Sequence, residues 1–75
     1  MSYTRVASTT TVRINGDARE IPAGLTVAGL LARLDLHPRM VVVEHNGTIL
    51  RREQLDEAAV NEGDQLELVH FVGGG

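Results

Sequence analysis

Hydrophobic and polar residues alternate in the first patterned part of the chain. Thr11 to Asn15 repeats with period two, which predicts a β-strand with Val12 and Ile14 on one face. Gly16-Asp17 follows as a turn, and Ala18 to Ile21 reads as a second short strand. Because so short a glycine-containing link joins them, we expect the two strands to form an antiparallel hairpin.

The next segment changes to the helical period. Its apolar residues recur at positions i, i+3, i+4 and i+7, one stripe of an α-helix: Val27, Leu30, Leu31 and Leu34. Thr26 precedes the stripe and is expected to cap the helix, since its hydroxyl can accept from a free amide of the first turn. Gly29 lies inside and costs roughly 1 kcal/mol relative to alanine. Pro38 disfavours helical geometry at His37 and is expected to close the segment.

β-branched residues dominate the middle of the chain. Met40 to His45 predicts a third strand, and Asn46-Gly47 is a strong hairpin signal because both residues tolerate positive φ. Thr48 to Leu50 is expected to return as a short fourth strand. In the mixed stretch that follows, Leu55 and Val60 are expected to reach the core while the charged residues stay in solvent.

The last patterned segment follows another turn, Asn61 to Asp64. Gln65 to Val72 predicts a final strand, with Leu66 and Leu68 facing the core. The element order is therefore β-β-α-β-β-β. A single helix of about ten residues can cover one face of a small mixed sheet and complete its core.

Composition and charge exclude several classes of protein. Seventy-five residues suffice for one domain, and with one Tyr, one Phe and no Trp the core must be aliphatic. The net charge is −3 and the seven basic residues are scattered, which argues against nucleic acid as a partner. The absence of cysteine excludes disulfides and thiolate ligands. We find no segment typical of a signal or a membrane span, so we expect a cytoplasmic protein that does not bind membranes.

The two ends differ from the patterned middle. Residues 1–10 are Ser/Thr-rich without periodicity and read as a flexible leader, followed by a domain at 11–72 and a flexible tail at 73–75. The tail is Gly73, Gly74 and Gly75. Because glycine has no Cβ, such a tail can thread a narrow channel and present its terminal carboxylate in another enzyme's active site. A frayed end or a linker is the alternative interpretation.

Three segments resemble the ThiS family, the sulfur carriers of thiamine thiazole synthesis: Leu25–Leu31, Val43–Glu53 and Gly63–Gly75. The resemblance runs from about Thr11 to the last residue, and its most specific part is the Gly63-Asp64 turn, the aliphatic strand and the terminal glycines. Two positions depart from the family, which usually has an apolar residue where His45 stands and often a proline where Arg51 stands. The resemblance implies an α+β fold of the ubiquitin-like β-grasp type, a mixed four- to five-stranded sheet with one main helix packed on one face.

The resemblance also implies a mechanism. An adenylating enzyme of the ThiF or MoeB type would use Mg-ATP to convert the Gly75 carboxylate into an acyl-adenylate. Sulfur from a donor protein would displace AMP and leave a thiocarboxylate, which thiazole synthase would consume. ATP and Mg would belong to the partner, in keeping with the absence of a phosphate loop here, and no cofactor would be bound by this chain. The protein would be a co-substrate and no enzyme.

Four apolar residues near the tail are candidates for partner binding. Val69 and Phe71 alternate with the core residues of the last strand and are expected to point away from the helix. With Val42 of the neighbouring strand and Val72 they would form an exposed patch that docks partners. The alternative is a second small cluster under a loop.

Other chemistry-bearing residues favour structural interpretations. The three histidines, His37, His45 and His70, match no metal-ligand spacing, so no metal site is expected. Glu62 and Asp64 are expected to belong to a solvated turn and to form no acid/base pair.

Two alternative functions remain open. One is another sulfur carrier, either the small subunit of molybdopterin synthase (the MoaD type) or a carrier for cysteine synthesis or tRNA thiolation. The other is a non-reactive β-grasp module that binds partners without using its tail.

Overall fold

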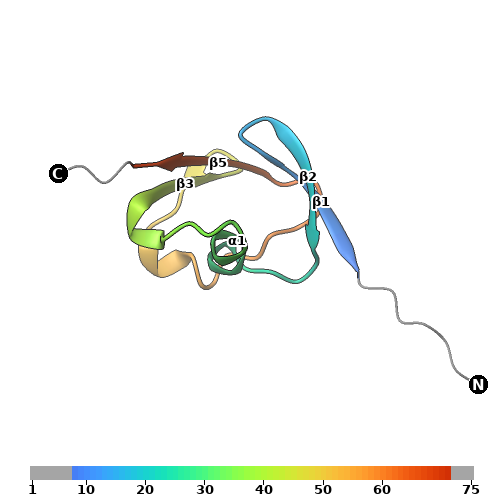
Figure 1. Ribbon diagram of the computed structural model, residues 1–75, viewed down its shortest axis with the longest axis horizontal. Helices are drawn as coiled ribbons and strands as arrows, with labels where there is room; N and C mark the ends of the chain where they lie inside the picture. The colour runs from blue at the N-terminus through green and yellow to red at the C-terminus, as the bar shows by residue number, and fades with distance from the viewer. Residues whose placement is uncertain (1–7, 72–75) are drawn as a thin grey trace, which may run out of the picture.

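The protein is an α+β domain in which a five-stranded sheet is covered on one face by a helix (Figure 1). The computed structural model describes residues 8–71. Its elements in chain order are β1 (Thr9–Ile14), β2 (Asp17–Pro22), α1 (Val27–Arg33), the 3₁₀ turn η1 (Pro38–Met40), β3 (Val41–His45), β4 (Thr48–Ile49), the 3₁₀ turn η2 (Arg52–Gln54) and β5 (Gln65–His70).

The strands are ordered β2-β1-β5-β3-β4, so the last strand lies in the centre of the sheet. β1 and β5 are parallel, and the other neighbours are antiparallel. The tight turns at Asn15-Gly16 and Asn46-Gly47, all four residues with positive φ, explain the two antiparallel hairpins. This is the β-grasp arrangement that the sequence resemblance implied.

The core lies between α1 and the sheet face that the helix covers. It is entirely aliphatic, as the composition requires. Its members are Val12, Ile14, Ile21, Val27, Leu30, Leu31, Val41, Val43, Leu55, Val60, Leu66 and Leu68. Leu55 and Val60 are buried as predicted, although they come from a segment with little regular structure. The other sheet face, called the open face below, has no helix over it in the part of the chain that the structure describes (Figure 1).

The helix is shorter than predicted. Thr26 caps it as expected, and its hydroxyl accepts from the Gly29 amide at 3.1 Å. The helix nevertheless ends at Arg33, well before Pro38. Asp35 adopts a φ of 60°, which the right-handed helix does not allow, and Pro38 instead starts η1. The expectation that Pro38 closes the helix is therefore wrong.

The first strand begins earlier than the hydrophobic pattern suggested. Thr9 pairs with Pro22 of β2, and the side chain of Thr10 continues the buried face of the strand, so β1 starts two residues before the expected Thr11. A run of threonines carries no apolar alternation, which is why the pattern did not reveal it. Ser8 precedes the strand, and its carbonyl accepts from the Ala23 amide at 3.0 Å. Residues 1–7 of the expected leader lie outside the described residues.

Other boundaries differ by one or two residues. The first turn is Asn15-Gly16 where Gly16-Asp17 was expected, and β2 is one residue longer at each end than the expected Ala18 to Ile21. β3 begins one residue late because Met40 closes η1, and β4 ends at Ile49. β5 ends at His70, whereas the pattern extended it to Val72, which lies outside the described residues. Phe71 still follows the sheet, because its amide donates to the Met40 carbonyl at 2.7 Å.

Candidate functional site

β5 is the element that leads to the C-terminal glycines, and it is held from both sides. It pairs with β3 over five residue pairs and with β1 at its start. Leu66 and Leu68 anchor it to the core. The expected reactive tail, Gly73 to Gly75, lies outside the described residues, so the structure places the strand that carries it and not the tail itself.

Asn15 extends the support of β5 beyond the end of β1. Its side-chain oxygen accepts from the Leu68 amide at 2.7 Å, and its side-chain amide donates to the Leu68 carbonyl at 3.2 Å. The side chain thus makes the two hydrogen bonds that another strand residue would have made. Sequence reasoning placed Asn15 only at the end of a strand and missed this contact, which joins residues 53 positions apart.

An apolar patch lies on the open face beside the end of β5. Val69 and Phe71 are 55% and 49% exposed, which confirms the predicted direction of their side chains. Val42 stands directly opposite Val69 and is half-buried. Ile49, which the sequence analysis did not single out, is 65% exposed and reaches the same face through its pairing with Glu44. Val72 lies outside the described residues.

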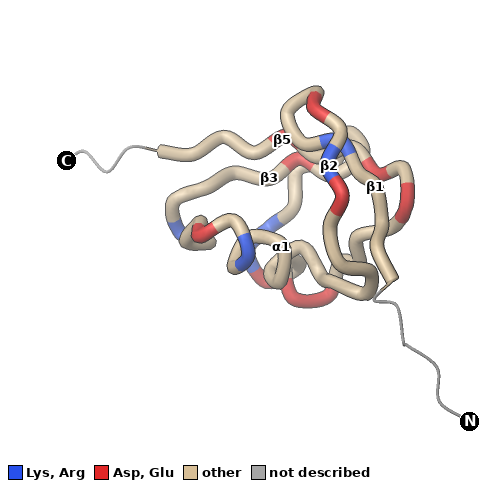
Figure 2. The backbone as a smooth tube through the Cα atoms, turned by 45° about the vertical axis from the view of Figure 1, so that its right-hand side comes forward, with Lys and Arg blue, Asp and Glu red and all other residues tan. Residues whose placement is uncertain are grey.

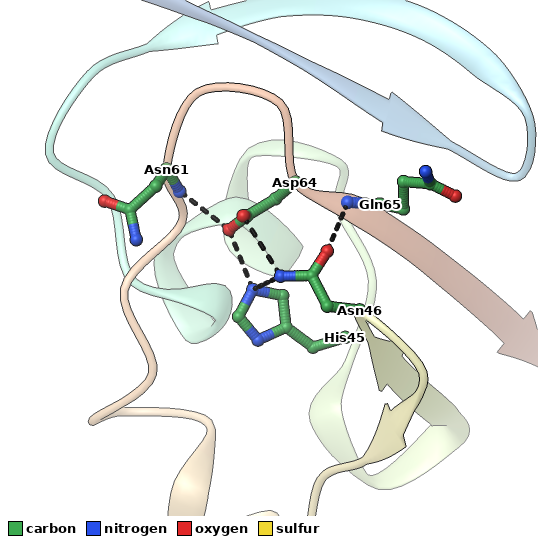
Figure 3. A network of polar contacts seen from close by, with 5 residues as sticks. All are labelled: His45, Asn46, Asn61, Asp64 and Gln65. Atoms are coloured by element: carbon green, nitrogen blue, oxygen red, sulfur yellow. Dashed lines mark hydrogen bonds and ion pairs between the residues drawn. The ribbon is translucent and has the colours of Figure 1, made fainter.

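A polar network closes the opposite end of β5 (Figure 3). Asp64 is at its centre and accepts from the Asn61 amide at 2.8 Å and from the Asn46 side chain at 3.1 Å. With a proton on Nε2, His45 donates to the same carboxylate at 2.8 Å. The side-chain oxygen of Asn46 accepts from the Gln65 amide at 2.9 Å. The network therefore ties the β3–β4 turn to the turn that starts β5.

The environment of Asp64 corrects the expectation of a solvated turn. The residue is only 9% exposed. Burial raises the pKa of its carboxyl, but hydrogen bonds from His45, the Asn61 amide and Asn46 together outweigh burial and hold the pKa below its ordinary value of 3.8. The carboxylate of Glu62 has a different partner, because it accepts from the Thr11 amide at 2.9 Å. Both residues serve the fold.

The departure from the family at His45 acquires a structural explanation here. The ring lies half-buried against Asp64, so a polar residue is accommodated because it has a partner. Between residues 8 and 71 no group of three or more potential ligand side chains lies close enough to hold a metal ion. Within the same range no helix has the length and apolar character needed to cross a membrane.

The chain resembles known proteins in both sequence and fold. The sequence profile of the ThiS family matches residues 12–75. The sulfur carrier protein ThiS of Bacillus subtilis is 42% identical over 50 residues, which are 67% of this chain and 76% of that protein. The crystal structure of a thiamine biosynthesis protein (ThiS) from Geobacter metallireducens matches with a TM-score of 0.74 at 35% identity, over 88% of this chain and 100% of that one.

A second kind of relative is much longer. A thiazole synthase of Paramagnetospirillum magneticum is 45% identical over 62 residues, which are 83% of this chain and 19% of that protein. The chain spans about a fifth of the length of the thiazole synthases that it matches.

Proposed function

Because this chain belongs to the ThiS family, we propose that it is a sulfur carrier of thiamine (thiazole) biosynthesis whose working group is the Gly75 carboxylate. The observation that carries the proposal is the position of β5. This strand is bonded to β3 along its length and to β1 at its start, and its carboxyl end leaves the sheet at one end of the molecule (Figure 1). Phe71 and Val72 connect it to the terminal glycines. A rigid domain can thereby deliver a tail without side chains to a partner.

The chemistry of the tail divides between this chain and its partners. A carboxylate oxygen of Gly75 attacks the α-phosphorus of Mg-ATP in a ThiF/MoeB-type adenylating enzyme, and pyrophosphate leaves. Sulfide (HS⁻) released by a donor protein then attacks the activated carbonyl, AMP leaves, the sulfur loses its proton, and a thiocarboxylate remains. The partner supplies the metal and the phosphate contacts. This chain acts as a co-substrate, and its contribution is binding and presentation.

Thiazole synthase is the acceptor that the comparisons favour. Proteins with that name contain a segment similar to most of this chain. A carrier-like segment in the same polypeptide as its acceptor would raise the local concentration of the sulfur donor. We therefore propose transfer to thiazole synthase ahead of transfer to a molybdopterin acceptor.

We assign docking to the open face beside the end of β5. Val42, Val69 and Phe71 present apolar surface there, and Val72 follows in sequence. A patch of this kind, at the end of the strand that precedes the glycines, allows one partner surface to hold the domain while a channel receives the glycines.

Mass spectrometry tests the proposed function. The chain ending at Gly75 is incubated with a ThiF-type adenylating enzyme, Mg-ATP and a sulfur-donor protein, and its intact mass is measured. We expect a mass gain of one oxygen-to-sulfur exchange, localised to Gly75 by fragmentation. An unchanged mass with an active enzyme would contradict the proposal and favour the non-reactive module.

Two tail variants sharpen this test. Gly75→Ala should slow adenylation, because a methyl group would meet the walls of a channel shaped for glycine. Deletion of Gly74 and Gly75 should abolish it. Neither change touches the core, so thermal unfolding should match the unmodified chain. Adenylation of Gly75→Ala at the normal rate would argue against a narrow channel.

A further inference from the structure

Two glutamates stand directly opposite each other on the open face. Glu44 of β3 pairs in register with Glu67 of β5, one step along the same face from the pair Val42 and Val69. A shallow hollow of about 460 Å³ lies over them, lined also by Asn46, Gly47 and Gln65. Figure 2 shows the acidic positions in red on both strands where they run side by side.

This arrangement is unfavourable in the free protein. Like charges directly opposite each other on neighbouring strands destabilise a sheet. Among residues 8–71 the ion pairs are His45–Asp64 and Arg51–Glu53, so neither Glu44 nor Glu67 has a cationic partner there. Arg13 lies on the same face by register, but its guanidinium donates to the Gly16 carbonyl at 3.0 Å.

We propose that Glu44 and Glu67 receive an arginine side chain of the adenylating enzyme when that enzyme docks on the open face. The inference rests on the proposed function and adds the chemistry of the partner surface. A guanidinium has five donors in a planar fork and can bond two carboxylates at once. Equivalent positions two residues along a strand are about 7 Å apart, so one partner surface can contact both the apolar pair and the acidic pair.

The negative charges of Glu44 and Glu67 also argue against two other partners for the open face. A second copy of this chain, packed symmetrically on the same face, would bring two acidic pairs together. Nucleic acid would meet the same repulsion, because its backbone is anionic. The acidic pair therefore keeps the exposed Val69 and Phe71 from joining copies of the chain, and it selects a basic partner.

The test measures affinity and stability on the same variants. Binding of a ThiF-type adenylating enzyme is followed by calorimetry for the wild-type chain, Glu44→Gln, Glu67→Gln and the double variant, at low and high salt. We expect the double variant to bind roughly tenfold more weakly and to lose much of the salt dependence. Its melting temperature should stay the same or rise, because the repulsion is gone. Glu57→Gln, in the loop before β5, is the matched control and should change neither quantity.

The outcomes separate this inference from the proposed function. If the wild-type chain gains sulfur but the double variant binds the enzyme as tightly, the inference is overturned alone. A double variant that binds weakly because it melts at a lower temperature also overturns it, since the role would be structural. A wild-type chain that dimerises through this face in sedimentation experiments contradicts it. Failure of the wild-type chain to be converted overturns the proposed function and the inference with it.

Discussion

Two polar side chains in this protein make hydrogen bonds of the kind that backbone groups make elsewhere in the sheet. Asn15 replaces a strand residue beside Leu68, and Asp64 gathers donors from the Asn61 backbone and from two side chains of the β3–β4 region. Both side chains satisfy groups far away in sequence. These hydrogen bonds stabilise the fold mainly by leaving no buried group unpaired, because an unpaired buried group costs about 1–3 kcal/mol.

Asp64→Asn should destabilise the protein by about 1–3 kcal/mol at pH 7 and flatten its acid sensitivity. The pKa of Asp64 lies below 3.8 in the folded chain. Its contribution to stability is therefore complete above about pH 5 and disappears as the pH falls through the folded-state pKa. Urea unfolding between about pH 3 and pH 7, followed by circular dichroism, measures both effects.

The exposed Asp56 supplies the control for this experiment. Asp56→Asn should leave both the stability and its pH dependence close to those of the wild-type chain. A wild-type curve that is flat below pH 5, or one that Asp64→Asn reproduces unchanged, would show that the network does not bind the unprotonated carboxylate preferentially.

At the scale of elements, the short helix depends on the sheet. Seven residues are too few for a stable isolated helix, so α1 forms because Val27, Leu30 and Leu31 are completely buried against the strands. The cap at Thr26 and the left-handed Asp35 set its ends. The hairpins, in contrast, are specified locally by their Asn-Gly turns.

Two glycine-to-alanine changes should have opposite signs. At Gly29 a Cβ would meet its nearest atom, on Leu25, at 3.4 Å, which is ordinary contact, so Gly29→Ala should stabilise by roughly 0.5–1 kcal/mol. Gly47 has open space around it but a φ of +88°, so Gly47→Ala should destabilise by about 1 kcal/mol. Denaturant midpoints measured side by side check the pair. Destabilisation by both would indicate that the helix has no room for the methyl group.

For the molecule as a whole, a substitution in the core should unfold the domain without altering the glycine tail. A domain of this size is expected to be stable by only a few kcal/mol. Leu30→Ala removes a fully buried side chain, at a cost of about 2–5 kcal/mol, and should leave much of the protein unfolded while its glycines remain intact.

Adenylation kinetics of Leu30→Ala show whether the enzyme recognises the glycine tail alone or also the folded domain. If docking on the folded open face is required, kcat/KM should fall in proportion to the folded fraction measured by circular dichroism. Ala23→Gly, at an exposed turn position before α1, serves as the folded control. Normal kinetics on a largely unfolded Leu30→Ala would show that the glycines suffice and that the sheet face contributes nothing.

Local sequence predicted much of the fold and the exposed patch. Alternation placed Val69 and Phe71 outside and Leu66 and Leu68 inside, because side-chain direction in a strand depends only on parity. The Thr26 cap and the Asn46-Gly47 turn could also be predicted from the sequence, since each depends on a few adjacent residues. The end of the helix at Arg33 was missed, because any of several residues before Pro38 could have adopted the terminating conformation.

The sequence by itself determined the aliphatic core, the element order and the glycine terminus, since composition, periodicity and covalent order are local properties. Only the tertiary structure decided which residues meet across the sheet. It paired Glu44 with Glu67, placed Asn15 beside Leu68 and buried Asp64 against His45. These contacts depend on strand order and register, which are set by how the whole chain buries its apolar face and not by any one segment.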